Sequence, residues 1–406
     1  MKIFTPVVVL SLLLLFSISF AQTEAQIAPG RTEWDHGILM FKSDDGAFQT
    51  RFDMRAYLNG GYFFEDEDRL SSGTHVRKAR FTLKTLLYNT WRAEWDIDVA
   101  EGVVEIKDMF LSFVGFDNSH IKFGHFKMPL GLEELMTSRY QTFVERAYPM
   151  MAFETDRHLG LQYSRWGTNW NLRSAVFGQT MDAVKNKSMD ETGNGAAARL
   201  VYTPIQNSKA IIHTGLALAY QKPDDESNAM EFQSEAETKL GDAEILSTGT
   251  VFDVSYAFKT GLEGVMVYKN LSLQGEYIQT NLQRMNGAEN ATLSGGYAFI
   301  SWILTGEMRP WVKEEGEFGQ IIPKSNTVGA WEIAARYSHL NLSDDKAGIT
   351  GGKANNYTLG LNWYANPNIR FILNYTYVDN SIFATNDGFP GNYDFSVLHF
   401  LAMVFF

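Results

Sequence analysis

The sequence contains no cysteine in 406 residues. This excludes disulfides, thiol chemistry and cysteine-based metal sites, so hydrogen bonding and packing alone must hold the folded chain together. Beyond residue 21 the sequence also lacks any run of about 18 consecutive apolar residues, the length that a membrane-spanning helix requires. The longest candidate, residues 210–220, is interrupted by His213, Thr214 and Gly215. We therefore predict no transmembrane helix in this part of the chain.

Two further absences narrow the functional classes. The formal net charge is −12, which argues against nucleic acid as a partner. The patterns GxSxG and HExxH and the P-loop pattern do not occur, and the eight histidines are scattered along the sequence. We therefore predict that the protein is not an enzyme and that it uses neither a cofactor nor a metal.

The beginning of the chain has the organisation of an export signal. Lys2 precedes an apolar stretch over residues 7–20, and a small residue, Ala21, follows before the sequence turns polar. A charged start, a short apolar core and a small residue at the cleavage site are typical of a secretory signal peptide. We predict that residues 1–21 are a signal peptide and that the mature chain begins at Gln22.

The last fourteen residues read YDFSVLHFLAMVFF, with Leu398, Phe400, Ala402 and Val404 at alternate positions. Residues two apart share one face of a strand, so this segment predicts a strand with one continuous apolar side. The closing strand of an outer-membrane barrel has this pattern because its outer face contacts lipid. A buried strand of a secreted soluble β-sandwich is the alternative.

Alternation of apolar and polar residues recurs along the chain, for example at residues 91–99, 212–220, 331–337 and 357–377. About sixteen to eighteen such segments can be counted, and strands of about 9–11 residues span a membrane. We predict an all-β fold: a transmembrane antiparallel β-barrel of about 16 strands, or up to 18, over residues 46–406, with residues 22–45 as an N-terminal arm or first short strand. The 14% content of aromatic residues suits the girdles of such a barrel.

The predicted connections differ in length. Residues 89–90 and 366–368 form tight turns, which outer-membrane barrels place on one side of the membrane, opposite their long loops. The long polar connections cover residues 180–194, 221–249, 305–326 and 381–392. The loop at 221–249 is rich in Asp and Glu, and we interpret it as a solvated outer loop rather than a cation site.

Basic side chains gather on one predicted inner face. Residues 76–88 read VRKARFTLKTLLY, so Lys78, Arg80 and Lys84 face the lumen while the apolar residues between them face lipid. Such a column attracts anions into a pore. By parity Arg77 faces outward, unless it lies beyond the lipid boundary or at a bulge. Carboxylates also occupy inner positions, and some are expected to pair with the arginines.

One long segment, about residues 129–157, interrupts the alternation. Residues 132–145 within it have helical spacing, and long loops inside compact folds are usually functional. We predict that this segment folds into the barrel and narrows it. Arg139, Arg146 and Arg157 lie along it, and guanidinium groups suit planar or tetrahedral oxyanions.

Several blocks of the sequence are similar to one known family. VRKARFTLK, EIKDMFLSF, FGHFKMPLGLEELMTSRYQTFVER, LTGEMRPW, GAWEIAARYSHLNL and YTLGLNWYANPNIRFILNY, which together span nearly all of the mature chain, resemble the phosphate-selective porin O and P family. The resemblance implies a sixteen-stranded trimeric barrel that passes phosphate or larger phosphate anions through a constriction of arginine and lysine. The matching motifs carry over Arg77, Lys78, Arg80, Lys127, Arg139 and Arg146 as anion-binding residues, and Asp108 as a residue that orients cations. The inner faces here mix both signs of charge, unlike the arginine ladders of the family.

We therefore predict a porin in the outer membrane of a Gram-negative bacterium. Its predicted function is the passive diffusion of small anions, with phosphate or phosphorylated compounds as solute. The predicted partners are phosphate or other small anions, the lipid bilayer and two further copies of the chain in a homotrimer. A general or sugar-selective porin without phosphate preference is the alternative, and a purely structural or adhesive barrel is a third possibility.

Overall fold

The computed structural model describes residues 30–35, 37–64, 70–100, 102–181, 193–223, 227–240, 245–382 and 394–406. The predicted signal peptide, residues 22–29 of the predicted arm, and most of the loops at 180–194 and 381–392 lie outside the described residues. In the described ranges, no helix is long and apolar enough to cross a membrane.

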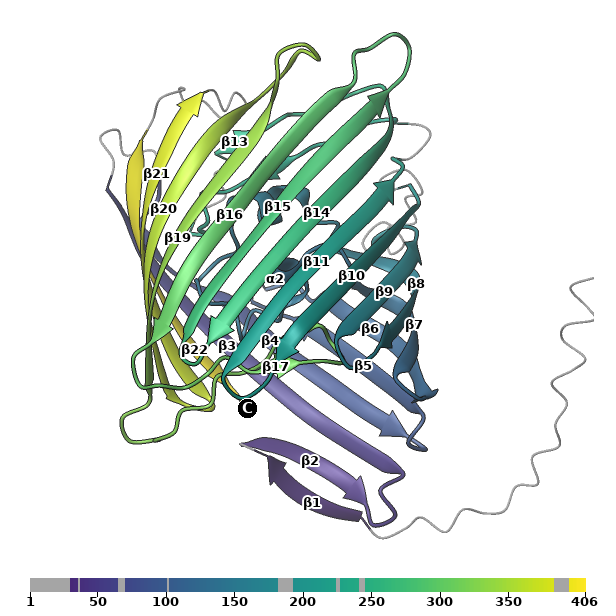
Figure 1. The fold of residues 1–406 in the computed structure, drawn as a ribbon, viewed down its shortest axis with the longest axis vertical. Helices are drawn as coiled ribbons and strands as arrows, with labels where there is room; N and C mark the ends of the chain where they lie inside the picture. The colour runs from purple at the N-terminus through teal and green to yellow at the C-terminus, as the bar shows by residue number, and fades with distance from the viewer. Residues whose placement is uncertain are drawn as a thin grey trace, which may run out of the picture.

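Sixteen antiparallel strands of the described chain form one closed barrel (Figure 1). Each strand pairs with the next along the barrel, and the last pairs with the first from Arg55 and Phe405 to Phe64 and Ser396. This confirms the predicted fold class and fixes the strand number at the lower predicted value. The strands are β3 (Phe48–Phe64), β4 (Gly73–Leu87), β5 (Trp91–Asp98), β6 (Glu105–Phe116), β7 (Ser119–Lys127), β8 (Arg157–Trp166), β9 (Trp170–Phe177), β10 (Gly195–Gln206), β11 (Ala210–Gln221), β14 (Val254–Tyr268), β15 (Leu271–Arg284), β16 (Ala291–Ile303), β19 (Ala330–Asp344), β20 (Ile349–Asn366), β21 (Ile369–Ile382) and β22 (Phe395–Phe405).

Two further strands precede the barrel. β1 (Gly30–Asp35) and β2 (Ile38–Ser43) form a hairpin, and β2 pairs with β3 from Leu39 and Phe52 to Lys42 and Gln49. The hairpin lies below the barrel in Figure 1, on the side where the chain ends. β2 and β22 thus pair with the same edge of β3, β2 near the start of β3 and β22 along the rest of it.

The alternation seen in the sequence separates a lipid face from a lumen face. On β11, Leu216 is 42% exposed whereas its neighbour Ala217 is 2% exposed. Outward aromatic rings also form rows across β19 to β22. Trp331 and Trp363 stack at 5.5 Å between ring centroids near the short turns, and Tyr337 and Tyr357 lie 5.3 Å apart farther along the same strands. Two such rows match the girdles that outer-membrane barrels place at their two interfaces.

The connection between β16 and β19, residues 304–329, corrects one sequence prediction. Its length had placed it with the long loops, but β16 runs toward the end of the tight turns, so this connection lies among them. Loop length does not determine the side, because the side follows from whether an even or an odd number of strands precedes the connection. The segment carries a small hairpin, β17 (Trp311–Val312) and β18 (Glu317–Phe318), which Figure 1 shows near the chain end.

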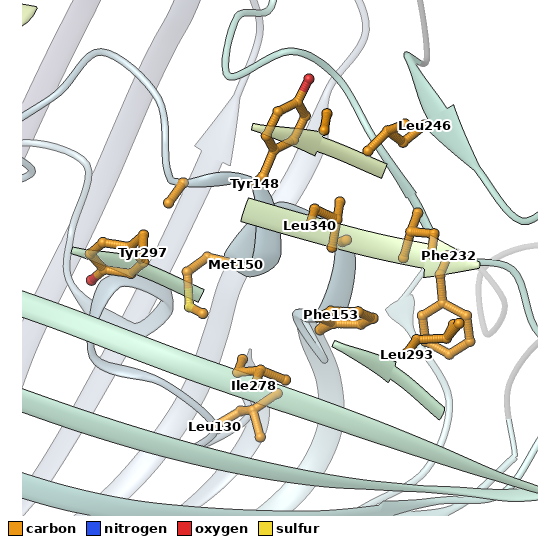
Figure 2. Close-up of a cluster of buried hydrophobic side chains, with 14 of the residues drawn as sticks. Leu130, Tyr148, Met150, Phe153, Phe232, Leu246, Ile278, Leu293, Tyr297 and Leu340 are labelled. Atoms are coloured by element: carbon orange, nitrogen blue, oxygen red, sulfur yellow. The ribbon is translucent and has the colours of Figure 1, made fainter. Parts of the chain in front are cut away.

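The apolar core of this barrel lies inside its ring. The connection between β7 and β8, residues 128–156, enters the lumen as predicted and carries α2 (Leu132–Leu135) and α3 (Tyr148–Phe153). Figure 2 shows side chains of this segment among wall residues of the barrel, including Ile278, Leu293 and Leu340, which belong to one buried cluster. We call residues 128–156 the constriction segment. Burial of its apolar side chains against the wall stabilises its position in the lumen.

Candidate functional site

The start of the constriction segment is held by a carboxylate of the barrel wall. Glu276 on β15 accepts hydrogen bonds from the backbone N–H groups of Leu132 at 2.7 Å and Glu133 at 2.8 Å. These N–H groups have no partner within α2 because they belong to its first turn. The hydroxyl of Tyr297 donates a third hydrogen bond to Glu276 at 2.6 Å. A wall residue thus takes the place of a local helix cap.

The second helix of the constriction segment, α3, is held by a long loop of the barrel. The loop between β11 and β14, residues 222–253, carries β12 (Gln233–Ser234) and β13 (Leu246–Ser247) and brings Glu237 against the segment. Glu237 accepts the N–H of Tyr148 at 2.8 Å and a hydrogen bond from Arg336 at 2.7 Å. Arg336 also donates to the carbonyl of Glu145 at 3.0 Å. Part of the predicted acidic loop therefore lies against the constriction segment rather than only in solvent.

The predicted helix over residues 132–145 is wrong beyond its first turn. The backbone groups that a longer helix would pair internally are taken by the barrel wall instead. Arg370 donates to the carbonyls of Arg139 at 3.1 Å and Thr142 at 3.3 Å, and Asn374 accepts the N–H of Val144 at 2.8 Å. The helical spacing of apolar residues in this stretch therefore does not indicate a continuous helix, because the barrel wall binds the backbone there.

A cavity of about 730 Å³ remains beside the constriction segment. Fourteen arginine and lysine side chains line it, against nine aspartate and glutamate side chains, which is an excess of five positive charges. The whole chain, by contrast, has a net charge of −12. The positive charge is therefore concentrated in the lumen, where it attracts anions. In the residues that the structure covers, no group of three or more His, Asp or Glu side chains is arranged to hold a metal ion.

The predicted basic column on β4 faces the lumen, and two of its members are paired. Arg80 lies 2.7 Å from Asp98, and Lys84 lies 3.3 Å from Glu94. Both carboxylates are on β5, which pairs directly with β4. The basic residues on the inner face of β4 therefore form ion pairs with the acidic residues on the inner face of β5.

Arg77 also faces the lumen, although its parity points outward. A register shift in the β3–β4 pairing near Leu58 places it at a bulge, one of the two positions that the sequence left open. Its guanidinium lies 2.7 Å from Glu145 of the constriction segment. Burial works to raise the pKa of Glu145, but the charges of Arg77 and Lys78 hold that pKa well below its usual value. The pair therefore stays ionised.

The other predicted cations line the same cavity and are also paired. Lys127 and Arg146 both contact Glu134, and Arg146 contacts Glu154 as well. The remaining two pairs join Arg157 to Asp108 at 2.9 Å and Arg139 to Asp53 at 3.6 Å. All nine predicted residues thus come together around one cavity, where Asp108 forms an ion pair with Arg157.

Lys78 differs from the other predicted cations. Within the described part of the chain, no carboxylate lies within ion-pair distance of its ammonium group, which instead lies 5.4 Å from the ring centroid of Tyr57. An aromatic face attracts a cation without neutralising its charge. Among the predicted residues, Lys78 therefore offers its charge most directly to a solute in the cavity.

Sequence reasoning named eight of the fourteen cavity cations as site residues and missed the other six, which are Arg51, Arg55, Arg92, Lys122, Arg173 and Lys239. Lys122 on β7 has no carboxylate within ion-pair distance among the described residues, and its ammonium lies 4.3 Å from the ring of Phe110. Arg55 on β3 was also missed, and it lies 2.8 Å from Asp96. The signal for Lys122 was present, because it lies between the lipid-facing Ile121 and Phe123 and so must face inward.

The sequence is similar to known porins over most of its length. A profile of the family described as phosphate-selective porin O and P matches residues 27–392. Porin O of Pseudomonas aeruginosa is 24% identical over 364 residues, covering 80% of this chain and 81% of that protein. An uncharacterized protein of Caulobacter vibrioides is 25% identical over 367 residues, covering 87% of this chain and 72% of that protein.

Solved structures show the same barrel. The anion-selective porin from Comamonas acidovorans has a TM-score of 0.57 at 12% identity, covering 88% of this chain and 100% of that chain. OmpT of Vibrio cholerae has a TM-score of 0.56 at 12% identity, covering 90% of this chain and 99% of that chain. At these identities the likeness shows a shared fold.

Proposed function

The chain belongs to the phosphate-selective porin O and P family, and we propose that this outer-membrane porin passes phosphate or phosphorylated compounds through the cavity beside its constriction segment. The observation that carries the proposal is the excess of five positive charges around that cavity in a chain of net charge −12. Diffusion is passive, and the family and the fold are those of channels.

The mechanism follows from how the cations are held. An anion entering the cavity exchanges part of its hydration shell for hydrogen bonds from ammonium and guanidinium groups. Lys78 supplies an ammonium group that has no carboxylate within ion-pair distance in the described residues. The paired residues keep their donors fixed in direction and moderate the attraction, so the anion can leave again. These paired residues are Arg77, Arg80, Lys84, Lys127, Arg139, Arg146 and Arg157, with Asp108 as the orienting carboxylate.

Export and assembly complete the proposal. Residues 1–21 serve as a signal peptide, residues 22–45 as an N-terminal arm or first short strand, and residues 46–406 as the membrane domain. The porin works as a homotrimer in the bilayer, with its short turns on the periplasmic side. A trimer form of OmpT of Vibrio cholerae, which shares this fold, supports that assembly.

A general or sugar-selective pore is the second candidate function. It is favoured by aromatic side chains on the cavity wall, since stacking on rings is how proteins often bind sugars and other planar solutes. Phe110, Phe126, Tyr140 and Phe318 line the cavity. The charged residues outnumber them, so we rank this function second.

Single-pore recordings in a planar bilayer test the proposal. Wild-type pores should be anion-selective under a KCl gradient, and added phosphate should block their chloride current. A charged hydrogen bond contributes about 1.5–3 kcal/mol, so Lys78→Met should raise the blocking concentration at least tenfold.

Lys84→Met is the matched control for this experiment. It removes the same charge from the same face of β4, but that charge is already paired with Glu94. We expect it to shift the block much less. Cation selectivity without phosphate block would refute the proposal, and current block by sugars instead would support the second candidate.

A further inference from the structure

A second segment enters the lumen from the end of the short turns. The tip of the β17–β18 hairpin is fixed by donors on the barrel wall. Asn171 donates to the carbonyls of Lys313 at 3.2 Å and Glu314 at 2.8 Å, and Arg199 donates to the carbonyl of Gly316 at 3.0 Å. The hairpin is therefore held against β9 and β10, and its tip reaches the cavity.

The side chain at this tip is Glu315. Its carboxylate contacts the guanidinium of Arg173, which also donates to the carbonyl of Glu315 at 2.5 Å and to Glu317 at 2.9 Å. Arg173 is almost fully buried, with 7% of its side chain exposed, whereas the Glu315 side chain is 50% exposed. The Glu315 carboxylate thus faces the open cavity from an anchored backbone.

Two further cations face this carboxylate. Lys122 and Arg92 line the same cavity, and neither has a carboxylate within ion-pair distance in the described ranges. Burial works to raise the pKa of Glu315, but the charges of Arg173, Lys122 and Arg92, with His120, hold that pKa below its usual value. A negative charge at this position is therefore stabilised by several cations together.

The position of Lys122 depends on aromatic rings instead of a carboxylate. Its ammonium lies 4.3 Å from the ring centroid of Phe110 and 5.2 Å from that of Phe126. Rings hold a cation in place through their negative faces and leave its net charge available. Lys122 is thus positioned to attract an anion at the short-turn end of the lumen.

We propose that Arg92, Lys122 and Arg173 form a second anion-binding site, which the chain's own Glu315 carboxylate occupies and which a permeating oxyanion enters by displacing it. Carboxylate and phosphate oxygens accept the same hydrogen bonds from guanidinium and ammonium groups, so the site takes small oxyanions of either class. Glu315 acts as a tethered competitor. It shortens the time that a solute spends at this end of the pore, which a conducting pore requires.

The inference rests on the proposed passage of anions and is tested by the same recordings, with phosphate added on each side of the bilayer in turn. Glu315→Gln removes the competing charge and keeps the size of the side chain. A tethered group acts at millimolar or higher effective concentration, so its loss should lower the blocking phosphate concentration about tenfold and lengthen the blocked intervals. The effect should be largest for phosphate added on the short-turn side.

Two variants make the result specific. Glu314→Gln removes the same charge from the neighbouring residue, and we expect it to shift the block less than threefold. Lys122→Met removes a cation of the site and should weaken block from the short-turn side in the Glu315→Gln background. Equal shifts for Glu314→Gln and Glu315→Gln would overturn the second site and leave the proposed function intact. Absence of phosphate block in wild-type pores from either side would overturn both.

Discussion

The cap that Glu276 supplies to α2 can be removed with little change in shape by Glu276→Gln. The carboxylate accepts two N–H groups of the constriction segment, at 2.7 and 2.8 Å. Leaving a buried N–H donor without its acceptor costs about 1–3 kcal/mol. Glutamine keeps one accepting oxygen but turns an N–H group toward the other donor. We expect a net loss of about 3 kcal/mol, which makes the undocked segment about 150-fold more populated.

Current recordings from single pores measure this change directly. Undocking of residues 128–156 widens the lumen, so Glu276→Gln pores should show brief excursions to higher conductance. Tyr297→Phe is the graded control, because it removes the third donor to Glu276, together with the acceptor of a Gln274 hydrogen bond, and leaves both N–H groups of the segment bound. That change should cost about 1 kcal/mol and raise the excursions less than tenfold. If Glu276→Gln pores are no noisier than Tyr297→Phe pores, the wall carboxylate does not hold the segment.

Three other outcomes are expected. Arg80→Met leaves Asp98 as a charge without its partner and should lower the free energy of unfolding by about 3–5 kcal/mol in urea titrations of barrels refolded into lipid vesicles. Burial raises the pKa of Glu235, so its stabilising contribution is complete below the unfolded value and is lost as pH rises through the folded value. Lowering the pH through this raised pKa should neutralise the cavity residue and increase anion selectivity, measured as reversal potential, and Glu235→Gln should reduce that pH dependence. Leu216→Arg on the lipid face should destabilise the barrel by about 2–4 kcal/mol, whereas Ala217→Ser on the lumen face should change it by less than 1 kcal/mol.

The fold could be predicted from the sequence because lipid and water impose opposite demands on alternate residues. In β11 the large apolar side chains of Ile212, Leu216, Leu218 and Tyr220 are exposed on the lipid face, and His213 is buried on the lumen face. Thr214 is the exception, a polar residue on the lipid face, and the lumen face also takes the small Ala217 and Ala219. The same rule located the constriction segment, since that stretch is where alternation stops. The preference of a single residue for lipid or for water could therefore be predicted from the sequence without knowing which residues lie next to it in space.

What could not be predicted depends on contacts between distant residues. Alternation placed Lys78 and Arg80 on one face, but it could not show that Arg80 meets Asp98 while Lys78 lies over Tyr57. The non-helical path of residues 139–142 likewise involves Arg370, a residue of β21 that binds the carbonyls of Arg139 and Thr142. To tell which lumen cations lack a carboxylate partner, one must know which strand residues lie opposite each other. Sequence periodicity alone does not give that pairing.

The seam between β22 and β3 joins Arg55 to Phe405, and one residue further Met54 and Phe406 exchange two backbone hydrogen bonds. These are among the pairings with the greatest sequence separation in the barrel, and the entropy lost in closing a chain grows with the length of the closed loop. Folding rates fall as such distant contacts dominate. Ring closure is therefore expected to be a late and slow event, and the strand edges of β3 and β22 stay unpaired until it occurs. During that interval the protein depends on its surroundings to protect two long edges from pairing with other chains.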